Sequence, residues 1–526
     1  MNSLTSWQKY KNNLYSNEAL GFYLDLSDTG ITETDRSNVV PLFNKALEAM
    51  GALEKGAIAN PDENRQVGHY WLRDPGLAPS SEIRTQIEET VESIISFSKQ
   101  IHQGTILTPS GEPFTNILLI GIGGSALGPQ FIADALGTSD GLSIDFLDNT
   151  DPDGIDHTLN SISGLLSQTL VIVISKSGGT AETRNGMLET QEFFSRHNLD
   201  FPKQSVAITG EGSQLYKTSI NEKWLSIFPM WDWVGGRTSI MSAVGLLPAA
   251  LLGVDINALL SGAKVMDQLT REKGINDNPA ALLALSWYII GEGKGNKDMV
   301  LLPYRDRLIL FSRYLQQLIM ESIGKELDLD GKIVQQGIAV YGNKGSTDQH
   351  AYVQQLRDGL DNFFVTFIEV LSERQGQSIL VDNDNTSGEY LFGFFKGTQT
   401  ALKQNNRRSL TITIEDLTPS TVGALIALYE RAVGFYASFV NINAYHQPGV
   451  EAGKKAAGKV LETKNRITDL LSEVDQALSI EDIISRLNLQ GEEVLVYHIL
   501  RHYAANHSLN VQGSFYDPEN LKVSKS

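Results

Sequence analysis

Short apolar runs alternate with glycine-rich or serine-rich loops and helical segments in the first half of the chain. Four of these runs are candidate strands: Ile117–Ile120, Leu142–Leu147, Thr169–Ile174 and Ser205–Thr209. A short, continuous apolar run is typical of a strand in a parallel sheet, because helices cover both faces of such a sheet. The alternation therefore predicts an α/β unit with a parallel sheet.

The same pattern returns in the second half of the chain. Its candidate strands are Val300–Leu302, Gly337–Tyr341, Phe363–Ile368 and Ser409–Ile414. Helices are predicted between them, at residues 308–324, 348–359 and 418–437. We therefore predict two α/β domains, each with a parallel sheet between layers of helices.

The domain boundaries follow from these two patterns. We predict a mostly helical N-terminal segment (1–100), a first α/β domain (101–254), connecting helices (255–295), a second α/β domain (296–445) and a helical C-terminal segment (446–526). The last segment contains two predicted helices, Ser479–Leu487 and Glu492–Ala504, around a short turn. Their spacing fits a helix-turn-helix, but the flanking residues are not basic, so a packing appendage is favoured.

Composition limits the classes of partner. The chain has 526 residues and a formal net charge of −19, which argues against a nucleic acid as the main partner. It has no cysteine, so disulfides, thiolate nucleophiles and cysteine-bound metals are excluded. The polar N-terminus and the absence of a long apolar run predict no signal peptide and no membrane segment. We expect a cytoplasmic protein.

The first glycine-rich loop, Gly121-Ile122-Gly123-Gly124-Ser125-Ala126, follows the first candidate strand. It partly matches a dinucleotide fingerprint, and Asp148 at the end of the next strand could serve as the ribose-binding acid. The alternative is a simple phosphate site, in which the glycines expose backbone N–H groups and Ser125 adds a hydroxyl. The loop by itself leaves a nucleotide-dependent oxidoreductase and a phosphate-binding protein both open.

The second loop, Ser175-Lys176-Ser177-Gly178-Gly179-Thr180, favours the phosphate site. It places three hydroxyls, one cation and two glycines at the start of a predicted helix. A terminal phosphate has several free oxygens that need donors, and the positive end of a helix favours the anion. The alternative is a serine-rich helix cap, but two such loops after neighbouring strands make a phosphate site the better explanation.

Three ionisable residues are candidates for acid–base chemistry. Glu321 lies at the end of the apolar helix 308–324, where it could be a proton-transferring base or a capping or salt-bridging glutamate. Arg237 follows two glycines, which suit close approach to a ligand but also a surface turn. His350 is predicted to open a helix capped by Ser346 or Thr347, where it could protonate or deprotonate a sugar oxygen.

Lys454 opens another predicted helix, and on its own it would be interpreted as a solvated lysine. The chain has no His-Glu-x-x-His motif, no carboxylate-rich cluster and no His-x-His pair. We therefore expect no metal.

Together these motifs resemble the glucose-6-phosphate isomerases, also called phosphoglucose isomerases. The resemblance rests on six segments: GIGGSALGP (121–129), SKSGGTAET (175–183), VGGRTSIMSAVGLLP (234–248), QQLIMESIGKELD (316–328), GNKGSTDQHAYVQQLRDG (342–359) and GVEAGKK (449–455). They extend over most of the chain, and the set is specific although no single segment is.

The resemblance implies two sugar-isomerase-type (SIS) domains and the reversible isomerisation of glucose 6-phosphate and fructose 6-phosphate in glycolysis and gluconeogenesis, without a cofactor. It implies that the phosphate of the sugar is bound by Gly124, Ser125, Ser175, Lys176, Ser177 and Thr180. By the same match, Glu321 is the base, Arg237 stabilises an enediol(ate), His350 and Lys454 assist ring opening, and Gln317 lines the site. The family's histidine comes from the partner subunit, so a homodimer with shared active sites is implied.

One alternative of a different class remains open at this point, a regulatory module that binds a sugar phosphate without catalysis. It accounts for the two loops but gives no reason for Glu321, Arg237, His350 and Lys454 to occur together.

Overall fold

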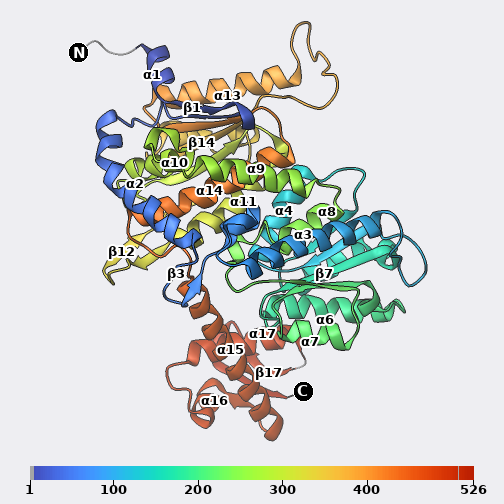
Figure 1. The fold of residues 1–526 in the computed structure, drawn as a ribbon. Coiled ribbons are helices and arrows are strands. Elements are labelled where there is room, and N and C mark those ends of the chain that lie inside the picture. The colour runs from blue at the N-terminus through green and yellow to red at the C-terminus, as the bar shows by residue number, and fades with distance from the viewer. Residues whose placement is uncertain (1–4, 508, 526) are drawn as a thin grey trace. The chain divides into compact units, whose positions relative to one another are not determined.

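The computed structural model describes residues 5–507 and 509–525. They form two compact units, the first ending at His446 and the second beginning at Gln447. Figure 1 shows both large sheets in the first unit, one around β7 and the other around β14. The two predicted α/β domains therefore belong to one compact unit, and side chains from both sheets enter a common hydrophobic core.

The first sheet has five parallel strands in the order β6-β5-β7-β8-β9. The strands are β5 (Asn116–Ile120), β6 (Ser143–Leu147), β7 (Thr169–Ser175), β8 (Ser205–Thr209) and β9 (Ser226–Pro229). Alternate side chains of β5 face opposite helical layers, since Leu118 packs with α5, α6 and α7 while Ile117 packs with α3, α4 and α8. These helices are α3 (Ser81–His102), α4 (Gly124–Leu136), α5 (Pro152–Ser161), α6 (Ala181–Arg196), α7 (Gln214–Asn221) and α8 (Ala243–Leu251). The predicted parallel sheet between helices is confirmed.

The second sheet has six strands in the order β1-β2-β15-β14-β10-β13. Its parallel part consists of β10 (Asp298–Pro303), β13 (Val340–Tyr341), β14 (Phe363–Val370) and β15 (Ser409–Ile414). One face packs against α12 (Val353–Asp358) and α13 (Ser387–Gln404). The predicted strand 337–341 is shorter in the structure, because only Val340 and Tyr341 pair with β10.

The described part of the N-terminal segment consists mostly of helices, but it also contains strands that were not predicted. After α1 (Ser6–Asn12), the strands β1 (Leu14–Asn17) and β2 (Phe22–Asp25) form an antiparallel pair, and β2 extends the second sheet beside β15. Each strand has four residues, and only Phe22 and Leu24 of β2 are buried. Runs this short carry too little periodicity to be recognised from sequence.

The other face of the second sheet is covered by long helices. These are α2 (Glu33–Glu54), α9 (Ile256–Leu269), α10 (Pro279–Ile290) and α14 (Pro419–Phe439). Residues 255–295, predicted as connecting helices, thus form part of the core, because α9 and α10 both pack on the almost fully buried α14. Figure 1 shows these helices side by side beneath β14. Of the helices in the described residues, none combines the length and apolarity needed to cross a bilayer.

Smaller elements connect these layers. Two hairpins pair β3 (Ile58–Asn60) with β4 (Arg65–Gln66) and β11 (Lys325–Leu327) with β12 (Ile333–Gln336). Short 3₁₀ helices are η1 (Glu18–Leu20), η2 (His69–Arg73), η3 (Pro75–Leu77), η4 (Ser163–Gln168), η5 (Phe201–Gln204), η6 (Gly236–Thr238), η7 (Ile275–Asp277), η8 (Asp306–Leu308) and η10 (Thr347–His350).

The helix predicted at 308–324 has a more complex form. It begins with η8, continues as α11 (Phe311–Leu315) and widens into a π-helical segment, η9 (Gln316–Glu321). Apolar periodicity indicates that a segment is helical, but it does not distinguish an α-helix from a π-helical insertion. Such insertions are frequent at functional sites, and this one carries both Gln317 and Glu321.

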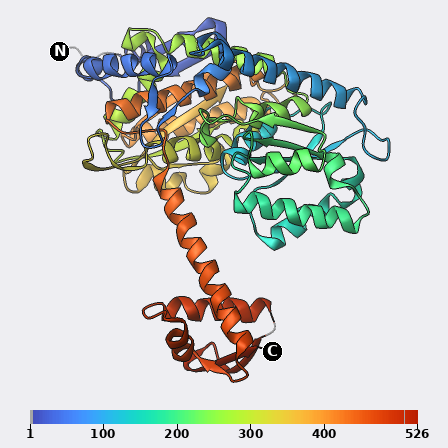
Figure 2. The same cartoon turned by 60° about the horizontal axis from the view of Figure 1, so that its bottom comes forward.

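The second unit contains a sheet as well as helices, which corrects the prediction of a helical C-terminal segment. It consists of α15 (Pro448–Glu473), β16 (Leu478–Ser479), α16 (Ile480–Leu487), α17 (Glu493–Asn506), β17 (Leu509–Ser514) and β18 (Asp517–Lys525). Figure 2 shows the long α15 leading to the smaller helices and the hairpin, with which it shares a core of its own. The hairpin was missed because Leu521 and Val523 are its only fully buried residues among those described.

Candidate active site

The two glycine- and serine-rich loops lie next to each other at one edge of the first sheet. Strands β5 and β7 pair in parallel, with Ile120 opposite Val173, so their carboxyl ends lie side by side. The loops after them begin α4 and α6, and Ser125 and Thr180 therefore lie at the starts of helices. Two positive helix ends at the carboxyl edge of a parallel sheet are suited to bind an anion.

A close backbone contact joins the first loop to the turn that carries Arg237. A Cβ atom added to Gly124 would lie 1.9 Å from the carbonyl oxygen of Gly236. The neighbouring Gly123 has φ +59, and a Cβ added there would lie 3.3 Å from Nε2 of Gln317. Position 124 thus has room only for glycine. The two glycines let the first loop lie close to the turn of Arg237 and to the side chain of Gln317.

The second loop is held by hydrogen bonds within it and to the segment 232–234. Ser175 Oγ donates to Thr180 Oγ1 (3.3 Å), and Ser177 Oγ accepts from the N–H of Gly179 (3.2 Å). Lys176 Nζ donates to the carbonyl oxygens of Asp232 (3.1 Å) and Val234 (3.2 Å), and burial lowers the pKa of this lysine. The loop thus presents a cation and several hydroxyls in one preformed turn.

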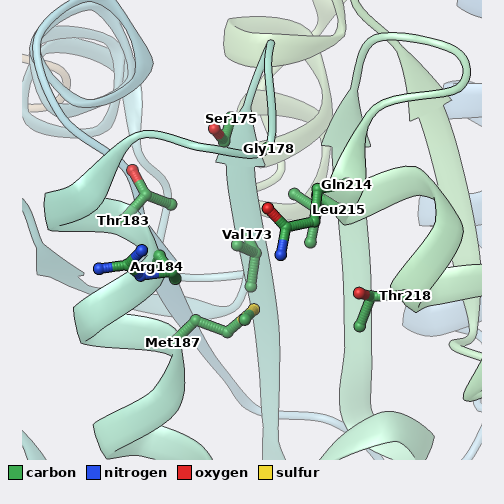
Figure 3. Close-up of a pocket in the computed structure, with 9 residues that line it drawn as sticks. All are labelled: Val173, Ser175, Gly178, Thr183, Arg184, Met187, Gln214, Leu215 and Thr218. Carbon is green, nitrogen blue, oxygen red and sulfur yellow. The ribbon is translucent and has the colours of Figure 1, made fainter.

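A small cavity lies behind this loop, between α6 and α7 (Figure 3). Its volume is about 30 Å³, and it is lined mainly by side chains such as Val173, Thr183 and Met187. Ligand pockets are typically about ten times larger. The cavity has room for a water molecule, and it is too small for a larger ligand.

Arg237 and Glu321 form an ion pair that is largely shielded from solvent. The Nε of Arg237 lies 3.2 Å from Oε2 of Glu321, and the two side chains are 6% and 19% exposed. Arg237 also donates from Nη1 to the carbonyl oxygen of Ala444 (3.0 Å) and from Nη2 to that of His446 (3.2 Å). Burial lowers the pKa of Arg237, and the charge of Glu321 partly offsets this effect. The glutamate is therefore salt-bridged, and its partner is a cation fixed by backbone carbonyls.

Comparison with known proteins decides the family. The model of a family described as phosphoglucose isomerase matches residues 25–477. The chain belongs to the phosphoglucose isomerase family. It is 56% identical to a glucose-6-phosphate isomerase of Nostoc punctiforme over 528 residues, which cover 100% of both chains. It is also 58% identical to that of Citrifermentans bemidjiense over 502 residues, or 95% of each.

Solved structures agree on the fold. A glucose-6-phosphate isomerase from Chlamydia trachomatis has a TM-score of 0.78 at 24% identity and covers 94% of each chain. A hypothetical protein from Thermus thermophilus has a TM-score of 0.71 at 25% identity and covers 84% of this chain and 99% of its own. The phosphoglucose isomerase fold thus extends through the unit that carries both loops, Arg237 and Glu321.

His350 has a different setting from the one predicted. It ends the short η10 and is exposed, whereas the next helix, α12, begins at Val353. Neither Ser346 nor Thr347 caps a helix with its side chain. In this loop the carboxylate of Asp348 accepts the N–H groups of Asn343 and Lys344. In the part of the chain that the structure describes, His350 forms no hydrogen bond or ion pair with Glu321 or Arg237.

Lys454 belongs to the second unit, where it is exposed on α15. Its role in ring opening stays a prediction for this member of the phosphoglucose isomerase family. Among the side chains that the structure describes, no group of three or more His, Cys, Asp or Glu is arranged to hold a metal ion.

Sequence reasoning missed the residues that hold the ion pair in place. Lys325 and the backbone of Ala444–His446 carry no motif of their own. Lys325 lies inside the segment 316–328 by which the chain resembles the isomerases, four residues after Glu321. That spacing is the signal that could have drawn attention to it.

Proposed function

We propose that the chain interconverts glucose 6-phosphate and fructose 6-phosphate, with Glu321 as the base. The observation that carries this proposal is the shielded pair of Arg237 and Glu321 beside two anion-binding loops. A sugar-phosphate sensor would use the loops, but it has no need for a buried carboxylate held against a fixed cation. Catalysis is therefore the better explanation of the site as a whole.

The proton transfers balance without any cofactor. The carboxylate of Glu321 removes the proton from C2 of the open-chain aldose, and negative charge develops on O1 of a cis-enediolate. Arg237 stabilises that charge, a proton passes from O2 to O1, and Glu321 returns its proton to C1 to give the ketose. Only protons move, so the reaction consumes no oxidant or reductant.

The phosphate does not react, but its binding energy orients the reacting carbons. Gly124, Ser125, Ser175, Lys176, Ser177 and Thr180 are the proposed donors. Gln317 lies on η9 four residues before Glu321 and adjoins Gly123, so we place it on the wall between the phosphate and the base. His350 and Lys454 open the sugar ring by giving a proton to the ring oxygen and removing one from O1.

The surface next to His350 supports a homodimer with shared sites. Gln349 donates to the carbonyl oxygen of Phe394 (2.9 Å), so the loop of His350 packs on α13. This helix exposes Tyr390, Phe392 and Phe394, and the segment before it exposes Ile379, Leu380 and Val381. Large exposed apolar patches mark interaction sites, and the occupant that we propose for this one is a second copy of this chain, with His350 beside the partner's Glu321. We also propose a cytoplasmic location and a role in glycolysis and gluconeogenesis.

A two-stage assay tests the activity. Purified protein is incubated with fructose 6-phosphate in the presence of a metal chelator and without nucleotide, and the glucose 6-phosphate formed is measured after quenching. Formation of glucose 6-phosphate that is lost in Glu321→Gln supports the isomerase. Binding of the sugar phosphate without turnover would instead support the sensor module.

A further inference from the structure

Lys325 is a buried lysine immediately behind the catalytic pair. It begins β11, and the residue is only 5% exposed. Its Nζ donates to the carbonyl oxygen of Glu321 (2.6 Å) and to that of His446 (3.2 Å). The side chain therefore joins the end of the π-helical segment to the stretch that precedes the second unit.

The carbonyl of His446 is shared between the two cations. It accepts from Nζ of Lys325 and from Nη2 of Arg237, both at 3.2 Å. Lys325 thus fixes the backbone of Glu321. It also shares the carbonyl of His446 with Arg237, so it contacts the backbone that holds Arg237. A displacement of Nζ would change the position of Glu321 relative to Arg237.

The stretch 443–446, which accepts hydrogen bonds from Arg237 and Lys325, is anchored to the N-terminal part of the chain. The side-chain amide of Asn443 donates to Asp62 (2.6 Å) and to Oδ1 of Asn60 (3.0 Å). His446 Nδ1 lies 3.2 Å from the carbonyl oxygen of Asn443. The hairpin β3–β4 therefore holds the stretch on which both cations rest.

A lysine at this buried position is energetically unfavourable if its side chain only fills space. Burial and the neighbouring charge of Arg237 disfavour the ammonium, and an unpaired buried charge costs more than an apolar side chain of the same size. The ammonium satisfies two backbone carbonyls that an apolar side chain would leave without this donor. We propose that Lys325 is a positioning residue that fixes the carboxylate of Glu321 relative to Arg237.

This inference rests on the proposed isomerase activity and makes a separate statement about geometry. Lys325→Met removes the donor at similar volume, and misplacement of a base by about 1 Å can lower a rate about 100-fold. We expect a fall in kcat of that order, whereas KM and the affinity for a non-reacting hexitol phosphate change little because the phosphate loops are untouched. Lys332→Met is the matched control, since that lysine follows β11 in the same hairpin and its side chain is 75% exposed.

Two further readouts separate positioning from a general loss of structure. Glucose 6-phosphate deuterated at C2 should show a larger isotope effect on kcat in Lys325→Met, because a misplaced base makes proton removal slower. Lys325→Arg, which keeps a cationic donor, should recover part of kcat. An unchanged kcat in Lys325→Met would overturn the inference. So would a loss of analogue affinity as large as the loss of kcat, found in both Lys325→Met and Lys325→Arg. An inactive wild-type enzyme would instead overturn the proposed function.

Discussion

The guanidinium of Arg237 contacts the carboxylate of Glu321 at 3.2 Å, and both side chains are largely shielded from water. Electrostatic interactions are stronger in such an environment than in bulk water. In the proposed reaction, Glu321 loses its charge when it takes a proton, and the enediolate gains one. Because Arg237 is held by the carbonyls of Ala444 and His446 as well, it can stay in place while its anionic partner changes from the enzyme to the substrate.

Replacement of Glu321 by glutamine should separate binding from chemistry. The amide has nearly the same shape but cannot accept the C2 proton, so we expect kcat to fall by a factor of about 10⁴ or more. The phosphate loops are unchanged, so calorimetry should give an affinity for a non-reacting hexitol phosphate within a few-fold of wild type. Turnover near the wild-type level would show that another residue is the base.

Gly124 should tolerate no side chain. The Cβ of Gly124→Ala would lie 1.9 Å from the carbonyl oxygen of Gly236, so the first loop and the turn of Arg237 must move apart. Overpacking of this kind typically costs about 1–3 kcal/mol, and we expect both the melting temperature and kcat to decrease. Gly51→Ala in α2 is the control, because nothing lies within 4 Å of the added Cβ. Equal behaviour of the two variants would contradict the spatial argument.

The sequence predicted those parts of the molecule whose signal is local. The buried strands β5 and β7 are continuous apolar runs, and the loops after them carry the glycines and hydroxyls of an anion site. The hairpin β17–β18 and the short strands β1 and β2 were missed, because most of their residues are exposed or partly buried. The pairing of Arg237 with Glu321 could be inferred only through the family resemblance. Their contact spans 84 positions of sequence, and the turn that carries Arg237 packs closely against Gly124.

The helix that carries Glu321 shows a second reason why sequence patterns cannot predict a site completely. Its apolar residues predicted a helix, and Leu315, Leu318 and Ile319 are indeed buried. The segment Gln316–Glu321 is π-helical, and Lys325 donates both to the carbonyl of Glu321 and to that of His446, which lies far away in the sequence. Such geometry is set by tertiary packing and leaves no local pattern.

Lys325 should contribute measurably to the pH dependence of the free energy of unfolding. Burial, and then the charge of Arg237, lower its pKa to about 7, while Glu321 and Asp62 act in the opposite direction. Below pH 7 the folded and unfolded chains both bind the proton, and between pH 7 and about 10.4 the unfolded chain binds more. The contribution of this group to the free energy of unfolding therefore rises with pH in that window, by at most about 1.4 kcal/mol per pH unit.

Lys325→Met lacks this titration. Its free energy of unfolding, measured by denaturant titration between pH 7 and 10, should rise less steeply with pH than that of the wild type. Lys332→Met should follow the wild type, because that side chain is exposed in both states. Parallel curves for wild type and Lys325→Met would mean that the folded protein does not disfavour the ammonium.

Mixed dimers test whether His350 acts across a subunit interface. If Glu321 of one subunit works with His350 of its partner, a dimer of Glu321→Gln with His350→Ala has one site with both changes and one site with neither. Two nearly inactive parents should then give a mixed dimer with about half of the wild-type activity per dimer. A mixture of Glu321→Gln with Arg237→Met is the control, because these two residues contact each other within one chain and each site would keep one defect. Mixed dimers purified through two different affinity tags are assayed for kcat, and activity at the parental level would place His350 and Glu321 in the same subunit's site.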